Sequence, residues 1–522
     1  MPSLLPTRSG RAADAVVILL VFSGVALYLC LLPWGLQAAD ESYFLVEAKR
    51  LRDGEVMYRD IFEFVTPLAT YAMATLFWLF GTTMATARIA MASLHGLTAA
   101  LLYAAARGLS VRRTLAAAVP LIYVALCQAV WPYASWHWFS TFGAAALLCA
   151  LVVGAWSQHP QRAIVPGLIS GVAIGMQQQK GIVLAAGVGL VFAIDALLDY
   201  RYRGHARWRL LIQRSAYFAL GVALVIVPLL AVFVIVAGPA AVYDALIRFP
   251  LETYRANFHC AWASFNPHEA QFTFPRVLKY SPALLLLPLL RWMWNVARGR
   301  RRELVTQLTA LIVLGAAAVL STWYYPDLIH VAFIAGVFWV AAAEGVDWIL
   351  SAVRPAILNR AAGGLALAGL CWALVPHMQH SGELLRQTFP VSYDTAFGRV
   401  DLTSEWEGAL VETIRPLLDA AGTHDLYCYP HYLSLYLTAD ARNPTPYQYF
   451  APAISPPAHT DRVLRTLEAR RLPYIVACPF LFRPTDPVAQ YIRANYAMLP
   501  MPDAPVGTYR LYGRKDLAAP AR

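Results

Sequence analysis

The 522-residue chain is too apolar for an ordinary soluble domain, since 59% of its residues are hydrophobic, 14% are charged and the mean hydropathy is +0.50. Soluble domains average about 45–50% apolar and about 25% charged residues. The formal net charge of +11 would suit a nucleic-acid-binding protein, but the arginines fall in short clusters between apolar runs. That spacing orients membrane segments, so composition predicts a protein embedded in the lipid bilayer and argues against nucleic acid as a partner.

The first apolar run, Ala15–Trp34, predicts an uncleaved transmembrane helix over 15–36. Arg8 and Arg11 precede the run, which indicates a cytoplasmic N-terminus. The run is longer than the core of a signal peptide, and Leu36–Ala39 offers no A-x-A cleavage site. The helix therefore delivers the next segment to the outer side of the membrane.

Residues 37–84 are expected to form the first outer loop, with interfacial helices. Within this loop, Pro67–Gly81 is apolar but short. If this stretch crossed the membrane, the arginine cluster of Arg107, Arg112 and Arg113 would lie outside. We therefore expect it to lie in the membrane interface.

Ten further apolar segments complete a bundle of about eleven transmembrane helices, each approaching the ~20 residues that cross ~30 Å of hydrocarbon. They are expected at about 85–106, 114–131, 138–156, 163–179, 181–199, 215–237, 280–296, 304–321, 330–350 and 361–377. The later arginines then fall in the cytoplasm, namely Arg162, Arg201–Arg214, Arg298–Arg302, Arg354 and Arg360. The predicted fold class is mainly α, a polytopic helix bundle over residues 1–377 in the bacterial inner membrane.

The remaining residues, 378–522, contain no spanning run and predict a small soluble domain on the periplasmic side. Ser404–Glu407 is a capping-box pattern that opens a helix to about Ala421. Alternating strands and helices follow, at about Asp425–Tyr429, Asp461–Arg471, Tyr474–Cys478, Pro487–Tyr496 and Thr508–Tyr512. This alternation predicts an α/β domain. Cys428 and Cys478 each end a strand, and the sequence leaves open whether they pair.

Acidic residues gather in the first outer loop, beginning where the first helix leaves the bilayer. Asp40 and Glu41 come first, followed by Glu47, Asp60 and Glu63, with Tyr43 between them. A carboxylate at the boundary between lipid and water can take a proton from a hydroxyl or hold a divalent cation against a phosphate. The plainer alternative is an acidic start of a solvated helix.

Other polar residues lie at the same membrane face. Lys180 follows Gln177–Gln179 at the outer end of an apolar helix, where a lysine can snorkel or bind a lipid phosphate. Asp327 and His330 stand at the outer end of another helix, and His137 lies among aromatic residues. Each also fits an aromatic belt, but their convergence on one face predicts a site open to both lipid and water.

These segments resemble the GT-C glycosyltransferases, and most closely the protein-mannosyltransferase-like and aminoarabinose-transferase-like membrane enzymes. The likeness is carried by Asp40–Tyr43, Arg52–Glu55, Tyr58–Phe64, Pro67, and Leu79–Gly81 followed by Ala87 and Arg88. Gly171–Gly181 is similar to a glycine-spaced helix that ends in a Lys/Gln pair, and Tyr325–His330 is similar to a late P-x-D…H segment. The resemblance covers most of the chain.

The resemblance implies an inverting glycosyltransferase that moves a hexose or pentose from a polyprenyl-phosphate donor to an envelope glycolipid, glycan or protein at the periplasmic face. It places Asp40 in the first-loop acidic position, as catalytic base or metal and acceptor contact, with Glu41 beside it. Lys180 would hold the donor phosphate together with neighbouring arginines, and Glu63 matches a loop acid that helps bind a metal in some relatives. Further substrate contacts are expected from Tyr43, Arg59, His137, Asp327 and His330.

One departure from the family pattern leaves metal dependence open. Trp136–Phe139 stands where some relatives place another acid, near the start of the fourth spanning helix. Two alternatives to the transferase remain: a polytopic transporter or flippase, and a non-catalytic envelope-assembly protein. The chain shows no internal repeat and places its acids in outer loops, which favours the enzyme over the transporter.

Overall fold

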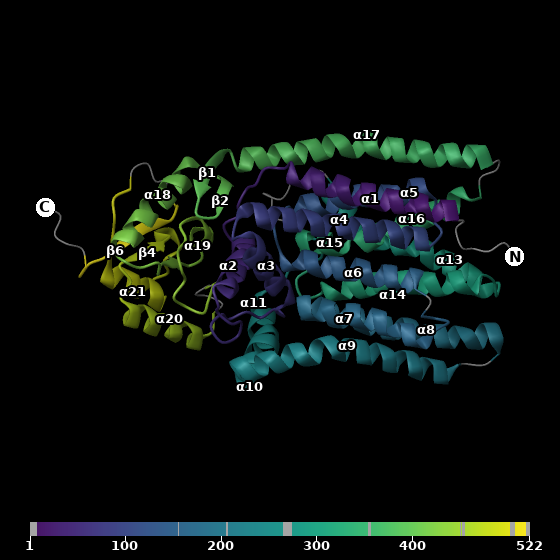
Figure 1. Cartoon of the computed structure of the whole chain (residues 1–522), viewed down its shortest axis with the longest axis horizontal. Coiled ribbons are helices and arrows are strands. Elements are labelled where there is room, and N and C mark those ends of the chain that lie inside the picture. Colours follow the sequence, from purple (N-terminus) through teal and green to yellow (C-terminus); the bar gives the residue numbers. More distant parts are fainter. Residues whose placement is uncertain are drawn as a thin grey trace.

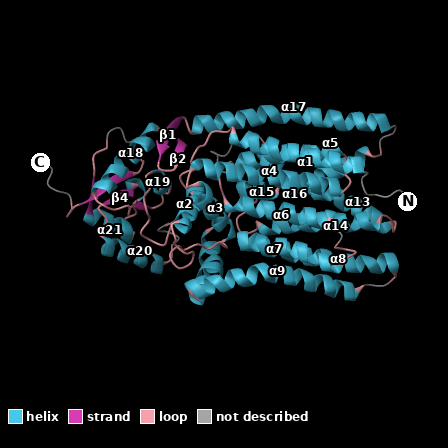
Figure 2. Ribbon diagram, in the orientation of Figure 1, coloured by secondary structure: helices cyan, strands magenta, loops and turns pink. Residues whose placement is uncertain are grey.

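The computed structural model describes residues 8–154, 156–204, 207–264, 274–352, 356–448, 450, 455–501 and 507–517, with the backbone alone at 8–11 and 356–360. A long bundle of helices occupies one end of the molecule and a small mixed domain the other, so the two termini lie at opposite ends (Figure 1). The described strands all lie in the C-terminal domain (Figure 2). Of the arginines expected in the cytoplasm, Arg354 lies outside the described residues, as do the side chains of Arg8, Arg11 and Arg360.

The bundle is built from the apolar segments of the sequence, and each segment expected to cross the membrane overlaps one or more of its helices. These helices are α1 (Arg8–Cys30), α4 (Met84–Gly108), α5 (Arg113–Ile122), η1 (Tyr123–Cys127), η2 (Gln128–Val130), α6 (Trp136–Val153), η3 (Pro160–Ala163), α7 (Ile164–Met176), α8 (Gln178–Arg203), α9 (Trp208–Ala237), η6 (Ser281–Leu285), α13 (Leu286–Ala297), α14 (Arg302–Ser321), α15 (Leu328–Ile334), α16 (Gly336–Leu350) and α17 (Ala356–Thr388). The predicted mainly helical membrane fold is confirmed.

The number of membrane-spanning helices differs from the expected count. Among the described residues, eight helices are long and apolar enough to cross a membrane, or nine if α15 and α16, which meet at a 57° bend, form one span. Helix α7 has 13 residues and α13 has 12, fewer than the ~20 of a full crossing. The count of about eleven is therefore not confirmed, because several apolar runs fold as short or broken helices.

Helices α1, α9 and α17 form the outside of the bundle, with 6%, 11% and 17% of their apolar windows buried. Their exposed side chains include large apolar groups such as Leu19, Ile235 and Trp372. Extended apolar surface of this kind is favourable against lipid and unfavourable against water. It supports the membrane location that the composition predicts.

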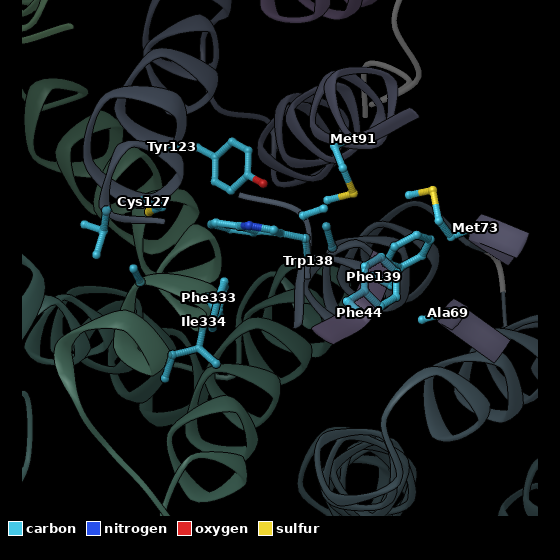
Figure 3. Close-up of a cluster of buried hydrophobic side chains, with 14 of the residues drawn as sticks. Phe44, Ala69, Met73, Met91, Tyr123, Cys127, Trp138, Phe139, Phe333 and Ile334 are labelled. Carbon is cyan, nitrogen blue, oxygen red and sulfur yellow. The ribbon is translucent and has the colours of Figure 1, made fainter. Parts of the chain in front are cut away.

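Two short helices, α2 (Asp40–Arg52) and α3 (Leu68–Phe80), lie at the end of the bundle next to the C-terminal domain, which we call the domain end (Figure 1). They are the helices expected in the first outer loop. Phe44 of α2 and Met73 of α3 join Trp138 of α6 in a buried cluster, in which these three side chains are at most 1% exposed (Figure 3). The cluster fixes α2, whose first residue is Asp40, against the bundle.

Further helical pieces belong to the segment 238–279, between the apolar segments 215–237 and 280–296. They are α10 (Pro239–Tyr243), η4 (Asp244–Tyr254) and α11 (Arg255–Asn257), followed by α12 (Pro275–Tyr280), which leads into η6.

Helix α17 passes the expected domain boundary at 377 and ends at Thr388. The C-terminal domain then contains a hairpin of β1 (Val391–Thr395) and β2 (Gly398–Leu402), and a four-stranded sheet in the order β3-β4-β6-β5. In that sheet β3 and β4 are parallel and the other neighbours antiparallel. The remaining elements are α18 (Glu405–Ala420), β3 (Tyr427–Tyr429), α19 (Ser434–Thr438), α20 (Pro457–Arg470), β4 (Tyr474–Ala477), η7 (Pro479–Leu481), α21 (Pro487–Asn495), β5 (Tyr496–Met498) and β6 (Arg510–Arg514). Cys428 and Cys478 are buried free thiols.

Candidate active site

Asp40 opens α2, and its side chain is exposed at the domain end. Gln37 holds the turn before it, because the Gln37 side-chain oxygen accepts hydrogen bonds from the N–H of Ala39 at 3.0 Å and from the N–H of Glu41 at 3.1 Å. Gln37 therefore acts as a helix cap and fixes the direction in which Asp40 leaves the chain. Partial loss of hydration raises the pKa of the Asp40 carboxyl, while the nearby charge of His330 lowers it.

Glu41 lies inside the bundle and is 0% exposed. Its carboxylate oxygens accept hydrogen bonds from both terminal guanidinium nitrogens of Arg88 on α4, from the N–H of Gln37 and, at 2.7 Å, from the N–H of Ala134. This network ties α2 to α4 and to the loop before α6. The structure thus gives the two expected catalytic acids different surroundings: Asp40 faces outward, and Glu41 holds Asp40 in position.

Asp327 and His330 form a second pair at the start of α15. Asp327 caps this helix, since its Oδ1 accepts a hydrogen bond from the His330 N–H at 2.7 Å and lies 2.7 Å from His330 Nδ1. A proton on Nδ1 leaves Nε2 of the same ring as an acceptor. Both residues are close enough to Asp40 for their charges to act on its carboxyl group.

Lys180 lies in the first turn of α8, just after the break from α7, where the Gln177 backbone is extended with φ −159°. Its side chain is buried: Lys180 is 3% exposed, and its Nζ lies 3.2 Å from Nδ1 of His137 and 5.0 Å from the centroid of the Phe333 ring. Gln177 Nε2 lies 3.0 Å from the same His137 nitrogen. Because two donors converge on Nδ1, we assign it as the acceptor and place the His137 proton on Nε2. Among the described residues, no carboxylate is within ion-pair distance of Lys180.

His137 joins these groups into one site. Its ring is perpendicular to that of His330, with 4.7 Å between centroids, and it stacks on Phe333 at 4.7 Å. The structure therefore brings together Asp40 from α2, His137 from α6, Lys180 from α8, and the Asp327–His330 pair from α15. An exposed carboxylate that is connected to a buried lysine through His330 and His137 suits a reaction in which one substrate gives up a proton and the other carries a phosphate.

Tyr43 and Glu63 belong to an adjacent buried cluster that also contains Glu47. Glu47 is 0% exposed and Glu63 is 1% exposed. Burial raises the pKa of both carboxyl groups, that of Glu47 well above its ordinary value, and it raises the pKa of Tyr43 as well. Two facing carboxylates offer only acceptors, so a proton shared between them satisfies both.

The metal-binding role expected of Glu63 stays a prediction. The Oε1 atom of Glu63 accepts a hydrogen bond from the N–H of Val65 at 2.8 Å. Within the part of the chain that the structure describes, no group of three or more His, Cys, Asp or Glu side chains is arranged to hold a metal ion.

Arg59 lies apart from the other expected substrate contacts. Its side chain is 48% exposed and pairs with Asp60 at 2.7 Å. It lines a cavity between the first outer loop and the C-terminal domain. Arg88 entered the sequence analysis only through the family likeness, and its pairing with Glu41 was missed, although a charged residue inside an apolar helix is a signal for a buried partner.

Neither a protein-family model nor a curated protein sequence matches the chain. Solved structures do match it. ArnT from Cupriavidus metallidurans bound to undecaprenyl phosphate has a TM-score of 0.59 at 14% identity, covering 99% of this chain and 100% of that one. The apo state of the same protein gives 0.58 at 16% identity over 98% and 100%. The Archaeoglobus fulgidus oligosaccharyltransferase, in complex with Zn and sulfate, gives 0.52 at 12% identity over 95% of this chain and 73% of that one.

These neighbours are GT-C proteins, and the likeness extends over nearly the whole chain. The chain therefore has the GT-C fold that the sequence resemblance predicted.

Proposed function

We propose that the chain is a membrane glycosyltransferase that moves a sugar from a polyprenyl-phosphate donor onto a hydroxyl group of an envelope glycolipid, glycan or protein. One observation carries this proposal: the exposed carboxylate of Asp40 shares a site with Lys180, which is 3% exposed and has no carboxylate within ion-pair distance among the described residues. A buried cation is costly unless a ligand supplies the opposite charge. A protein of the same fold, ArnT, has been solved with undecaprenyl phosphate bound.

The donor phosphate binds at the start of α8. Lys180 and the positive end of this 26-residue helix both favour an anion there. His137 accepts from Lys180 through Nδ1 and offers its Nε2 proton as a further donor. The bound phosphate then neutralises the buried lysine.

Transfer breaks the bond between the anomeric carbon and the phosphate oxygen, and forms a bond between that carbon and the acceptor oxygen. The polyprenyl phosphate leaves with the bonding electron pair, and Lys180 compensates its charge. The proton of the acceptor hydroxyl passes to the Asp40 carboxylate, whose charged form His330 stabilises. Attack opposite the leaving phosphate inverts the anomeric configuration.

We place the domain end on the periplasmic side of the inner membrane. Arginines are concentrated at the opposite end of the bundle, where α4 connects to α5, α8 to α9, and α13 to α14. The N-terminus lies at that end too (Figure 1). Positive residues mark the cytoplasmic side of multi-pass proteins, so this orientation exposes the site to lipid-linked sugars and to envelope acceptors.

The proposal is tested with purified protein in nanodiscs, incubated with a membrane extract that contains lipid-linked sugars and envelope glycolipids. Mass spectrometry should detect free polyprenyl phosphate together with an acceptor that has gained one sugar. The Asp40→Asn protein should produce neither. If the wild-type protein were a transporter or a scaffold, the masses of the lipids and acceptors would not change during the incubation. That result would contradict the proposal.

A further inference from the structure

Two cavities adjoin each other between the first outer loop and the C-terminal domain. One encloses about 780 Å³ and the other about 640 Å³. They share Arg50, Glu55 and Arg442 in their linings, so they lie next to each other on the same residues, and we call the two cavities together the arginine groove. None of the groups around Lys180 lines it.

The groove carries an excess of positive charge. Six arginines and three carboxylates line its larger part: Arg50, Arg59, Arg442, Arg462, Arg465 and Arg470 against Asp53, Glu55 and Asp60. Several of these charges already pair, since Arg50 and Arg442 both contact Glu55 and Arg59 pairs with Asp60. The smaller part adds Lys49, Arg52 and Arg415 against Asp440.

Helix α20 presents two arginines that lack an acidic partner among the described residues, Arg462 and Arg465. Arg462, Arg465, Thr466 and Ala469 line the groove, and the spacing i, i+3, i+4, i+7 places them on one helical face. Arg462 and Arg465 are exposed, and no carboxylate among the described residues is within ion-pair distance of either. Arg462 interacts with the hydroxyl of Tyr447, which is neutral at physiological pH. Two guanidinium groups on one face therefore remain available for an anion.

We propose that the arginine groove binds the anionic groups, phosphate or carboxylate, of a glycan acceptor. Guanidinium groups recognise such oxygens with paired, charge-assisted hydrogen bonds. Helix α2 connects the groove to the candidate active site, because it carries both Asp40 and Arg50. At a rise of ~1.5 Å per residue, the two residues are about 15 Å apart along the helix. The acceptor role rests on the proposed transferase function, whereas anion binding by the groove does not.

Binding is measured first, without donor or turnover, on the full-length protein in nanodiscs of zwitterionic lipid. The probe is a phosphorylated pentamannose, compared by calorimetry with the same sugar after phosphatase treatment. The test variant is Arg462→Gln/Arg465→Gln. The matched control is Arg399→Gln/Arg483→Gln, which removes two exposed arginines of the same domain that line neither cavity.

We expect the phosphorylated sugar to bind, with an affinity that falls as salt rises, and the neutral sugar to bind at least about tenfold more weakly. The test variant should weaken binding by about tenfold, and the control should stay within about twofold of wild type. The Asp40→Asn protein should bind as wild type does, so loss of transfer and loss of anion binding are separate results. Equal binding of both sugars, or equal loss in test and control variants, would overturn the proposal.

The acceptor role is tested in a null strain that is complemented with the same variants. Wild type and the control variant should restore the modified envelope component fully, and the test variant only in part. Full restoration by a test variant that no longer binds the probe would show that the groove does not serve the acceptor.

Discussion

At the scale of single residues, the adjacent acids Asp40 and Glu41 have opposite surroundings, and we expect them to have different roles. Asp40 is exposed and near His330, whereas Glu41 is 0% exposed and its oxygens accept four hydrogen bonds, two of them from Arg88. Sequence alone cannot separate these roles, because the direction of each side chain depends on a cap from Gln37 and on an arginine 47 positions away. Substitutions at the two positions should therefore fail in different ways.

The raised pKa of Asp40 predicts the acid limit of the reaction. As a base, Asp40 must be deprotonated, so the transfer rate should fall as pH drops through a value above the ordinary 3.8 of an aspartate. Since the charge of His330 lowers this pKa, His330→Gln should move the acid limb to higher pH. The transfer rate of the wild-type and His330→Gln proteins, measured against pH in nanodiscs, gives the acid limb and its shift. A rate that stays constant down to pH 4 would show that Asp40 is not the base.

Glu41 should matter for stability. Glu41→Ala leaves the guanidinium of Arg88 buried without its acid, which costs about 3–5 kcal/mol. We expect a much lower melting temperature and poor yield of folded protein, whereas Asp40→Asn should melt like wild type. Thermal unfolding of the purified proteins measures this. A stable but inactive Glu41→Ala protein would indicate that Glu41 takes part directly in the chemistry.

At the scale of elements, the break between α7 and α8 builds the donor site. Extended backbone at Gln177 ends one helix and starts the next, so Lys180 falls in a first helical turn, against His137 of α6. The sequence indicated a turn near Gln177–Lys180, but not the position of α6 across from it, since that contact joins segments about forty residues apart.

Lys180→Met should weaken donor binding selectively. Without its ammonium group, we expect the apparent KM for the lipid-phosphate donor to rise by about tenfold or more, with the KM for the acceptor nearly unchanged. Lys180→Arg keeps the charge and serves as the matched variant. Initial-rate kinetics with each substrate varied in turn measure the split. An equal rise in both KM values would indicate general disruption of the site.

The facing carboxyl groups of Glu47 and Glu63 predict a pH-dependent stability. Burial raises the pKa of both above the ordinary 4.5 of a glutamate. The folded state therefore keeps protons that the unfolded chain has released, so stability is greatest below the ordinary pKa and falls as pH rises through the raised pKa values. Glu47→Gln removes one of these acids and should flatten the dependence. The melting temperatures of the wild-type and Glu47→Gln proteins, measured from pH 4 to pH 9, test this prediction. Parallel plots of melting temperature against pH for the two proteins would contradict it.

At the scale of the whole molecule, most of the architecture could be predicted from the sequence. Long uncharged runs and arginine clusters predicted the helix bundle, and a short helix was expected within Pro67–Gly81, where the structure has one at Leu68–Phe80. The number of membrane-spanning helices could not be predicted from the sequence, because hydropathy gives the length of an apolar run and not the breaks inside it. The hairpin β1–β2 was missed, although Val391–Thr395 and Gly398–Leu402 both alternate polar with apolar or small residues, as a strand with one buried face does.

The candidate site was predictable in its residues and not in its geometry. Asp40, His137, Lys180, Asp327 and His330 are polar residues at the same ends of apolar segments, and that placement is visible in the sequence. Their distances depend on how α2, α6, α8 and α15 pack, which only the folded structure contains. The C-terminal domain adds the arginine groove, whose two sides come from segments that are remote in the sequence.

The central claim is that this site transfers a sugar to an envelope component and that Asp40 is the base. The most direct measurement is a mass profile of envelope glycolipids, glycans and glycoproteins from a null strain complemented with wild type or with Asp40→Asn, with equal membrane insertion verified for both. We expect one sugar mass to disappear in the null strain and to return only with the wild-type protein. The same profile with both versions would contradict the base role, and an unchanged profile in the null strain would contradict the transferase itself.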